Sequence, residues 1–116
     1  LELMARNLMA LHRADVKVVM GTDAGNPLTL HGPSVFVEME TMQAVGLQPL
    51  EVLRASTQYA AEAMGRGGDL GRVAVGYIAD LLVLDADPAA DIANMRALTH
   101  VCRAGQLHER VALLPR

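Results

Sequence analysis

Hydrophobic residues recur at intervals of three and four along three stretches of the chain, and this spacing predicts amphipathic helices. The first helix is expected over Leu1–Arg13, the second over about Ser34–Val45, and the third from Pro49 to Gly65. Proline in the first turn and glycine just past the last turn are typical helix boundaries, so Pro49 and Gly65 delimit the third helix. The first half of the chain is therefore expected to be mainly helical.

A different pattern occupies Val16–Met20, where four of five residues are apolar and only Lys17 is charged. This run predicts a parallel β-strand that is buried on both faces. Gly21 ends the run and delivers Thr22 and Asp23 into an open turn. Because the active sites of α/β sheets and barrels lie at the carboxyl ends of their parallel strands, Asp23 is a candidate catalytic carboxylate.

A structural interpretation of Asp23 competes with the functional one. An aspartate that precedes small residues commonly closes a turn by bonding its own backbone two residues further on. The spacing around Asp23 alone favours this turn, so the choice depends on features elsewhere in the chain.

Beyond Gly65, short apolar runs separated by glycines replace the helical spacing and predict strands. We expect strands at 72–75, 81–84 and 99–103, a short helical turn at 91–95, and a hairpin turn at 104–106. The chain is therefore expected to divide into residues 1–65 and residues 66–116.

Composition and charge narrow the class of protein. The chain has 116 residues, of which 52% are hydrophobic and only 3% aromatic, so its core must consist of Leu, Val, Ala and Met. Such small side chains suit layered α/β folds. The net charge is −3 and the basic residues are scattered, so neither nucleic-acid binding nor membrane binding is expected. A single cysteine, Cys102, excludes an intrachain disulfide, and a cytoplasmic location is expected.

The order and separation of these segments resemble the carboxyl-terminal quarter of the amidohydrolase superfamily, over almost the whole chain. Gly21-Thr22-Asp23-Ala24-Gly25 resembles the eighth barrel strand with its metal-binding aspartate, and His31-Gly32 followed by Glu38 is similar to the next segment. Residues 46–57 resemble the helix that leaves the barrel, and residues 70–88 resemble strands of a small β-sandwich. The His-Gly pair and the Pro-Leu-Glu helix are most similar to the imidazolonepropionase and prolidase-like dipeptidase branch.

The resemblance implies an α/β fold. Residues 1–65 would contribute the last strand–helix unit of a TIM-type (β/α)8 barrel, and residues 66–116 would contribute part of the small composite β-sandwich. Since the chain starts at Leu1 within a helical pattern and supplies one barrel strand, we expect it to be a piece of a longer protein.

The resemblance also implies roles for three residues. Asp23 would bind a divalent metal, zinc by default, and would act as general acid and base toward the metal-activated water. His31 would contact the substrate, although a solvated loop histidine explains it equally well. Thr22 would orient Asp23 through its hydroxyl, or would only satisfy nearby backbone groups.

These roles predict that the parent protein hydrolyses a non-aromatic carbon–nitrogen bond in an amide, a cyclic amide or a dipeptide. The other family ligands cannot be carried over, because the chain has no His-x-His pair and its histidines are His12, His31, His100 and His108. A lone aspartate holds a cation poorly, so the fragment alone is expected to be inactive.

A second function remains open: a non-catalytic structural or interaction module that self-associates. The unpaired edge of Val16–Met20 needs a partner in water, so the isolated chain is expected to dimerise or repack. A homo-oligomer is therefore expected. An upstream His-x-His pair would favour the enzyme, and a natural chain that starts near Leu1 would favour the module.

Overall fold

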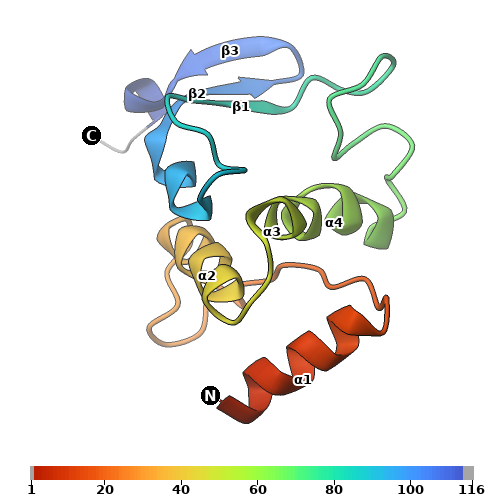
Figure 1. Ribbon diagram of the computed structural model, residues 1–116. Helices are drawn as coiled ribbons and strands as arrows, with labels where there is room; N and C mark the ends of the chain where they lie inside the picture. Colours follow the sequence, from red (N-terminus) through yellow and green to blue (C-terminus); the bar gives the residue numbers. More distant parts are fainter. Residues whose placement is uncertain (1, 114–116) are drawn as a thin grey trace.

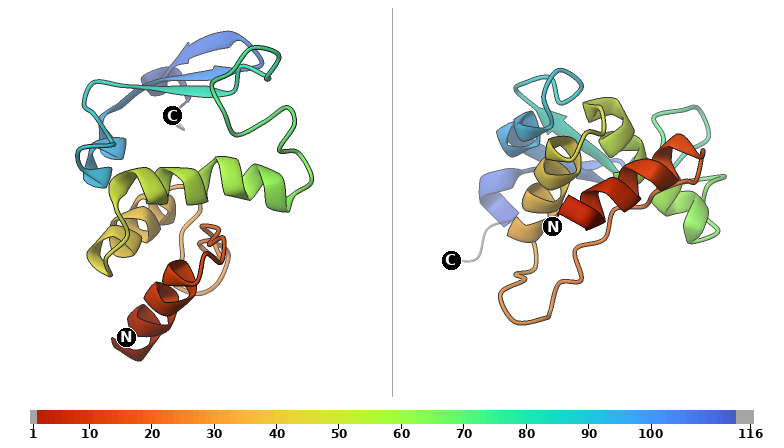
Figure 2. Two further views of the ribbon diagram at one scale, coloured as in Figure 1. Left: turned by 45° about the vertical axis from the view of Figure 1, so that its right-hand side comes forward. Right: turned by 60° about the horizontal axis from the view of Figure 1, so that its bottom comes forward.

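The computed structural model describes residues 2–113, which form helices in the first half and a three-stranded antiparallel sheet in the second. In chain order the elements are α1 (Glu2–Arg13), α2 (Pro33–Ala44), α3 (Pro49–Ser56), α4 (Gln58–Ala63), β1 (Leu81–Leu84), the 3-10 helix η1 (Ile92–Ala97), β2 (Leu98–Arg103), β3 (Gln106–Glu109) and the 3-10 helix η2 (Arg110–Leu113). Figures 1 and 2 show α2, α3 and α4 in the middle of the molecule, with the sheet on one side and α1 on the other.

The buried core lies between α2, α3 and η1. Its members are methionines and small aliphatic residues: Met39, Met42, Leu47, Val52, Ala55, Ile92 and Met95. This composition agrees with the expected core without large rings. The start of η1 is also fixed by a polar contact, because the backbone N–H of Ile92 donates to the side-chain oxygen of Gln43 at 2.8 Å. The core therefore joins the helical first half to the second half of the chain.

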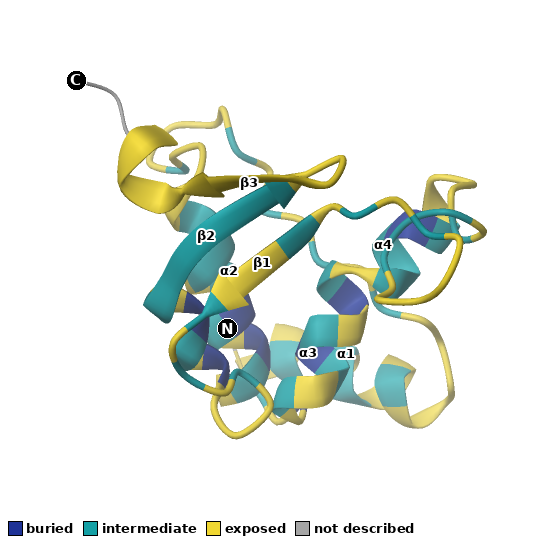
Figure 3. Cartoon of the chain, turned by 90° about the horizontal axis from the view of Figure 1, so that it is seen from above, coloured by how far each residue is buried: buried dark blue, intermediate teal, exposed yellow. Residues whose placement is uncertain are grey.

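The sheet has the strand order β1-β2-β3, with Leu81 opposite Cys102 and Cys102 opposite Leu107. Figure 3 shows β3 exposed and β2 half-buried beside it. The hairpin turn is confirmed, since Ala104 and Gly105 both have positive φ, 48° and 83°, as two-residue hairpin turns of type I′ require. The expected strands at 81–84 and 99–103 are likewise present.

The prediction of a strand at 72–75 is wrong for the described residues. Val73 and Val75 are 88% and 104% exposed, and the segment pairs with no neighbour. A strand needs backbone partners, and no part of residues 2–113 offers them here. An apolar run with glycines on both sides therefore did not suffice to define a strand.

The helices are predicted more accurately than the strands. The first two agree with α1 and α2 within one residue over the described part of the chain. The third is divided at Thr57, whose φ of −127° and ψ of −82° are not helical. The Thr57 hydroxyl donates to the carbonyl of Leu53 at 2.6 Å, and such back-bonding by threonine bends helices. The expected single helix is thus α3 followed by α4.

The expectation that the strand at Val16–Met20 is buried on both faces is wrong for the described residues. The segment is extended, but it belongs to no sheet. Val18 and Met20 pack against the core, whereas Val16 and Val19 are exposed. The segment is therefore covered on one face only, because no parallel neighbour exists within residues 2–113.

The loop after α4 returns to the junction of α3 and α4 at Gly71. A Cβ atom at Gly71 would lie 2.7 Å from the carbonyl oxygen of Thr57 and 2.9 Å from the Cβ of Ala61. The φ of Gly71 is +83°, which also favours glycine. Only glycine therefore allows this close approach.

We expect Gly71→Ala to destabilise the intact protein more than Gly76→Ala does. Gly76 has a similar φ of +86°, but an added Cβ atom would meet nothing within 4 Å, so it serves as a matched control for backbone strain alone. The additional cost at Gly71 should be about 1–3 kcal/mol, as for other overpacked sites. Equal unfolding free energies of the two variants in urea would show that the Gly71 contact can relax.

Candidate functional site

The extended segment Val16–Met20 leads to the loop that carries the candidate site residues. Few backbone hydrogen bonds hold it: Val16 N–H donates to the carbonyl of Leu11 and Met20 N–H to the carbonyl of Ala55, at 3.1 and 3.2 Å. The side chains of Val18 and Met20 anchor it to the core. The position of the following loop therefore depends mainly on side-chain contacts with the helices.

Lys17 makes the polar contact that ties this segment to α4. Its Nζ atom lies 2.6 Å from Oε2 of Glu62 and 5.5 Å from the centre of the Tyr59 ring. The hydrogen bond with Lys17 lowers the pKa of the Glu62 carboxyl, and the same bond raises the pKa of Lys17. Both groups are therefore charged at neutral pH and attract one another.

Asp23 lies in the turn directly after the extended segment. Its φ is +51°, a left-handed conformation that aspartate adopts more readily than most residues. The turn is closed by Asn26, whose side-chain amide donates to the backbone carbonyl of Asp23 at 3.0 Å. The Asp23 carboxylate itself is exposed and makes no hydrogen bond or ion pair within residues 2–113. The structural interpretation, in which this carboxylate closes the turn, is therefore not what the structure shows.

The rest of the loop forms a hydrogen-bonded turn that projects from the body of the molecule (Figure 2). Gly25 N–H donates to the carbonyl of Thr29 at 3.1 Å, and Thr29 N–H donates to the carbonyl of Asn26 at 3.0 Å. The ring of His31 covers Gly25, where a Cβ atom would lie 3.6 Å from Nε2. The loop thus holds Asp23 and His31 as parts of one unit.

Thr22 is half-buried, and its hydroxyl forms no hydrogen bond with Asp23 in the described part of the chain. Its expected orienting role stays a prediction. The same applies to the expected roles of Asp23 and His31.

The donor set of the described residues does not make a complete metal site. No group of three or more His, Cys, Asp or Glu side chains within residues 2–113 is arranged to hold a cation. The free carboxylate of Asp23 fits a role as one oxygen ligand, but protein sites for divalent cations use several ligands. Within residues 2–113, Asp23 therefore does not form a cation site with other side chains.

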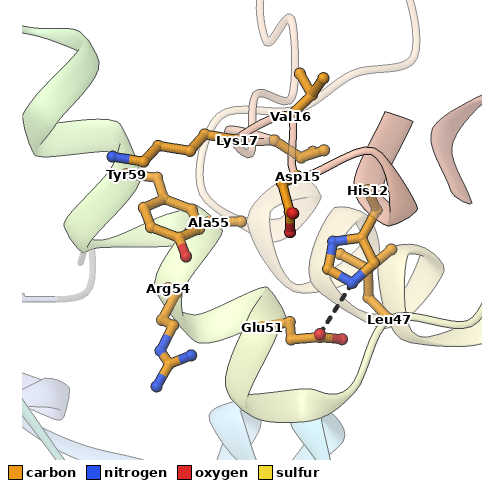
Figure 4. Close-up of a pocket in the computed structure, with 10 residues that line it drawn as sticks. His12, Asp15, Val16, Lys17, Leu47, Glu51, Arg54, Ala55 and Tyr59 are labelled. Carbon is orange, nitrogen blue, oxygen red and sulfur yellow. Dashed lines mark hydrogen bonds and ion pairs between the residues drawn. The ribbon is translucent and has the colours of Figure 1, made fainter. Parts of the chain in front are cut away.

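Sequence reasoning missed a polar pocket of about 210 Å³ between the end of α1 and α3. Figure 4 shows the carboxylate of Asp15 pointing between Tyr59 and the His12–Glu51 pair. Nε2 of His12 lies 2.9 Å from Oε1 of Glu51, and Oε2 of Glu51 accepts from the N–H of Gln48 at 2.7 Å, which caps α3. His12 therefore joins two helices.

This pocket is smaller than typical small-molecule sites of about 300–1,000 Å³, and neither Asp23 nor His31 lines it. The only sequence signal was a histidine in the last turn of one predicted helix and a glutamate in the first turn of another. Their meeting depends on helix packing, which spacing along the chain does not reveal.

Within residues 2–113, no helix has the length and apolar character needed to cross a bilayer.

Comparisons with known proteins find relatives in both sequence and structure. A sequence model of the amidohydrolase family matches residues 3–107. Imidazolonepropionase from Chromobacterium violaceum is 40% identical over 84 residues, which cover 72% of this chain and 20% of that protein. Ochratoxinase from Aspergillus niger is 30% identical over 107 residues, which cover 89% of this chain and 22% of that protein.

Among solved structures, a prolidase complexed with N-methylphosphonate-L-proline superposes with a TM-score of 0.73 and 34% sequence identity. The match covers 91% of this chain and 26% of the prolidase. The chain therefore spans about a fifth of the length of the two curated relatives and about a quarter of this structure.

We expect Glu62→Gln to loosen the attachment of Val16–Met20 and to lower the midpoint of thermal unfolding of the intact protein at pH 7 and low salt. The pKa of Glu62 is lowered in the folded state, so its stabilising effect is present above the ordinary carboxyl pKa of 4.5 and is lost as the pH falls through the folded value. The pKa of Lys17 is raised, so its effect persists until the pH exceeds the ordinary lysine value of 10.5.

The difference in melting midpoint between wild type and Glu62→Gln should therefore close as the pH falls below 4.5 and should shrink at high salt. Glu38→Gln is the control, because Glu38 has no ion-pair partner within residues 2–113. A difference that is the same at pH 7 and pH 3 would assign the effect of Glu62 to packing instead of charge.

Proposed function

The chain belongs to the amidohydrolase family, and from this premise we propose that the intact protein containing it is a metal-dependent hydrolase. The resemblance found in the sequence is confirmed by the family match over residues 3–107 and by the imidazolonepropionase relative. We infer that the bond cleaved is a non-aromatic carbon–nitrogen bond in an amide, a cyclic amide or a dipeptide. The names of the family and of the prolidase neighbour support this class of substrate.

The observation that carries the proposal is the state of Asp23. Its carboxylate follows an extended segment, stands exposed in a left-handed turn, and has no partner within residues 2–113. A carboxylate that only closed the turn would accept a hydrogen bond from the nearby backbone, but the side chain of Asn26 closes this turn. Asp23 is therefore free to act on a ligand.

In the proposed mechanism Asp23 accepts the proton of the attacking water and later passes it to the leaving nitrogen. Asp23 would also be one oxygen ligand of a divalent cation, zinc by our inference, with its other ligands outside this chain. That cation, when bound, supplies the chemistry of lowering the pKa of water so that it attacks at neutral pH. Thr22 would orient the carboxylate, and His31, held over Gly25, would contact the small-molecule substrate.

Further parts of the proposal concern the whole protein. Residues 1–65 would complete a TIM-type barrel, and residues 66–116 would form part of its β-sandwich. The fragment alone would be inactive, because it supplies one metal ligand. A cytoplasmic location is proposed on the ground that the sequence has a single cysteine, Cys102.

One observation favours a second function, a self-associating module without catalysis. Val16 and Val19 are exposed on the unpaired segment, and apolar unpaired edges promote association. The two functions differ in their dependence on Asp23, because self-association through Val16–Met20 does not require its carboxylate.

We expect Asp23→Asn in the intact protein to lower kcat at least about 1,000-fold on any amide, cyclic amide or dipeptide that the wild type hydrolyses, while the protein stays folded. Asn keeps the size of the side chain but cannot accept the proton. Steady-state kinetics and circular dichroism check the two parts of this expectation.

Asp85→Asn is the matched control, since Asp85 is an exposed aspartate that follows β1, outside the loop of Asp23. It should leave kcat unchanged. Near-normal turnover of Asp23→Asn would exclude the proton-transfer role. An intact wild-type protein that binds no metal and hydrolyses none of these substrates would favour the module.

A further inference from the structure

The tip of the loop between Met20 and α2 carries an apolar side chain that nothing in the described part of the chain covers. Leu28 is 101% exposed, and its neighbour Leu30 is 66% exposed. The φ of Leu28 is +70°, a conformation that branched residues rarely adopt. Such unfavourable backbone conformations are concentrated at functional sites, where the surrounding structure imposes them.

The hydrogen bonds that shape this tip also shape the turn of Asp23. Asn26 takes part in both. Its side-chain amide donates to the backbone carbonyl of Asp23. Its backbone carbonyl accepts from Thr29 N–H, and Leu28 lies in the turn that this second bond closes. Gly25 N–H then bonds the carbonyl of Thr29. The backbone of the turn that carries Leu28 is therefore held by the same contacts that hold the backbone of Asp23.

We propose that Leu28 is a specificity-determining residue that contacts an apolar group of the substrate beside the bond on which Asp23 acts. This inference rests on the proposed function of Asp23. An exposed leucine gains free energy when apolar surface covers it, and it offers nothing to a polar group. The substrate class is thereby narrowed to amides or dipeptides with an aliphatic or aromatic side chain next to the scissile bond.

The test uses the metal-loaded intact protein and two inert ligands, leucine hydroxamate and serine hydroxamate. They share one metal-chelating head group and differ only in the side chain, so the ratio of their Kd values reports the apolar contact. Isothermal titration calorimetry on wild type should show leucine hydroxamate binding about 5–10 times more tightly, as expected for a partly buried aliphatic side chain.

Leu28→Ser should reduce this ratio to about one, and Leu28→Met, which keeps an apolar side chain, should retain it. Leu50→Ser is the matched control: it makes the same chemical change at a half-exposed leucine on α3, and it should leave the ratio unchanged. Melting curves of each variant establish that it is folded.

The inference is overturned if wild type with a measured full metal content binds both hydroxamates equally or binds neither, or if Leu28→Ser keeps the wild-type ratio. A wild type that takes up no metal contradicts the proposed function instead. A Leu28→Ser variant that melts earlier but keeps the ratio would mean that another part of the protein covers Leu28. These failures are distinct from failure of the proposed function, which is shown by an active Asp23→Asn variant. An inactive Asp23→Asn together with an unchanged ratio in Leu28→Ser would reject this inference alone.

Discussion

The structure depends on holding an extended segment, Val16–Met20, without paired strands on either side. Backbone polar groups in such a segment need partners, yet helices are its neighbours within residues 2–113. Side-chain contacts therefore attach the segment to the helices. Val18 and Met20 pack against the core, and Lys17 contacts α4 from the opposite face. The turn of Asp23, which directly follows the segment, takes its position from these contacts.

Local patterns in the sequence predicted the elements that local interactions decide. The helical spacing of hydrophobic residues identified α1 and α2, and the turn at 104–106 identified the hairpin. Elements that depend on distant partners were predicted less well. Residues 72–75 have the composition of a strand, but pairing is a property of the neighbours, so these residues remain unpaired. Similarly, the break at Thr57 arises from the hydrogen bond of its hydroxyl with the carbonyl of Leu53, and the spacing of hydrophobic residues does not reveal such a bond.

The candidate site, too, could be predicted only as far as local patterns in the sequence determine it. Asp23 could be selected from the sequence because a glycine-flanked acidic residue after an apolar run is a local signal. Its freedom from hydrogen bonds could not be read there, because Asn26, and not Asp23, closes the turn. The chain spans only about a fifth of its curated relatives, and no metal-binding group of three or more side chains is present within residues 2–113.

Glu51 illustrates how one carboxylate can serve two elements at once. One of its oxygens accepts from the backbone at the start of α3, and the other bonds His12 at the end of α1. Substitutions at His12 and Glu51 are therefore not energetically independent: the cost of replacing either residue changes when the other has already been replaced. Sequence divergence in this protein should accordingly alter these two positions jointly, even though thirty-eight residues separate them along the chain.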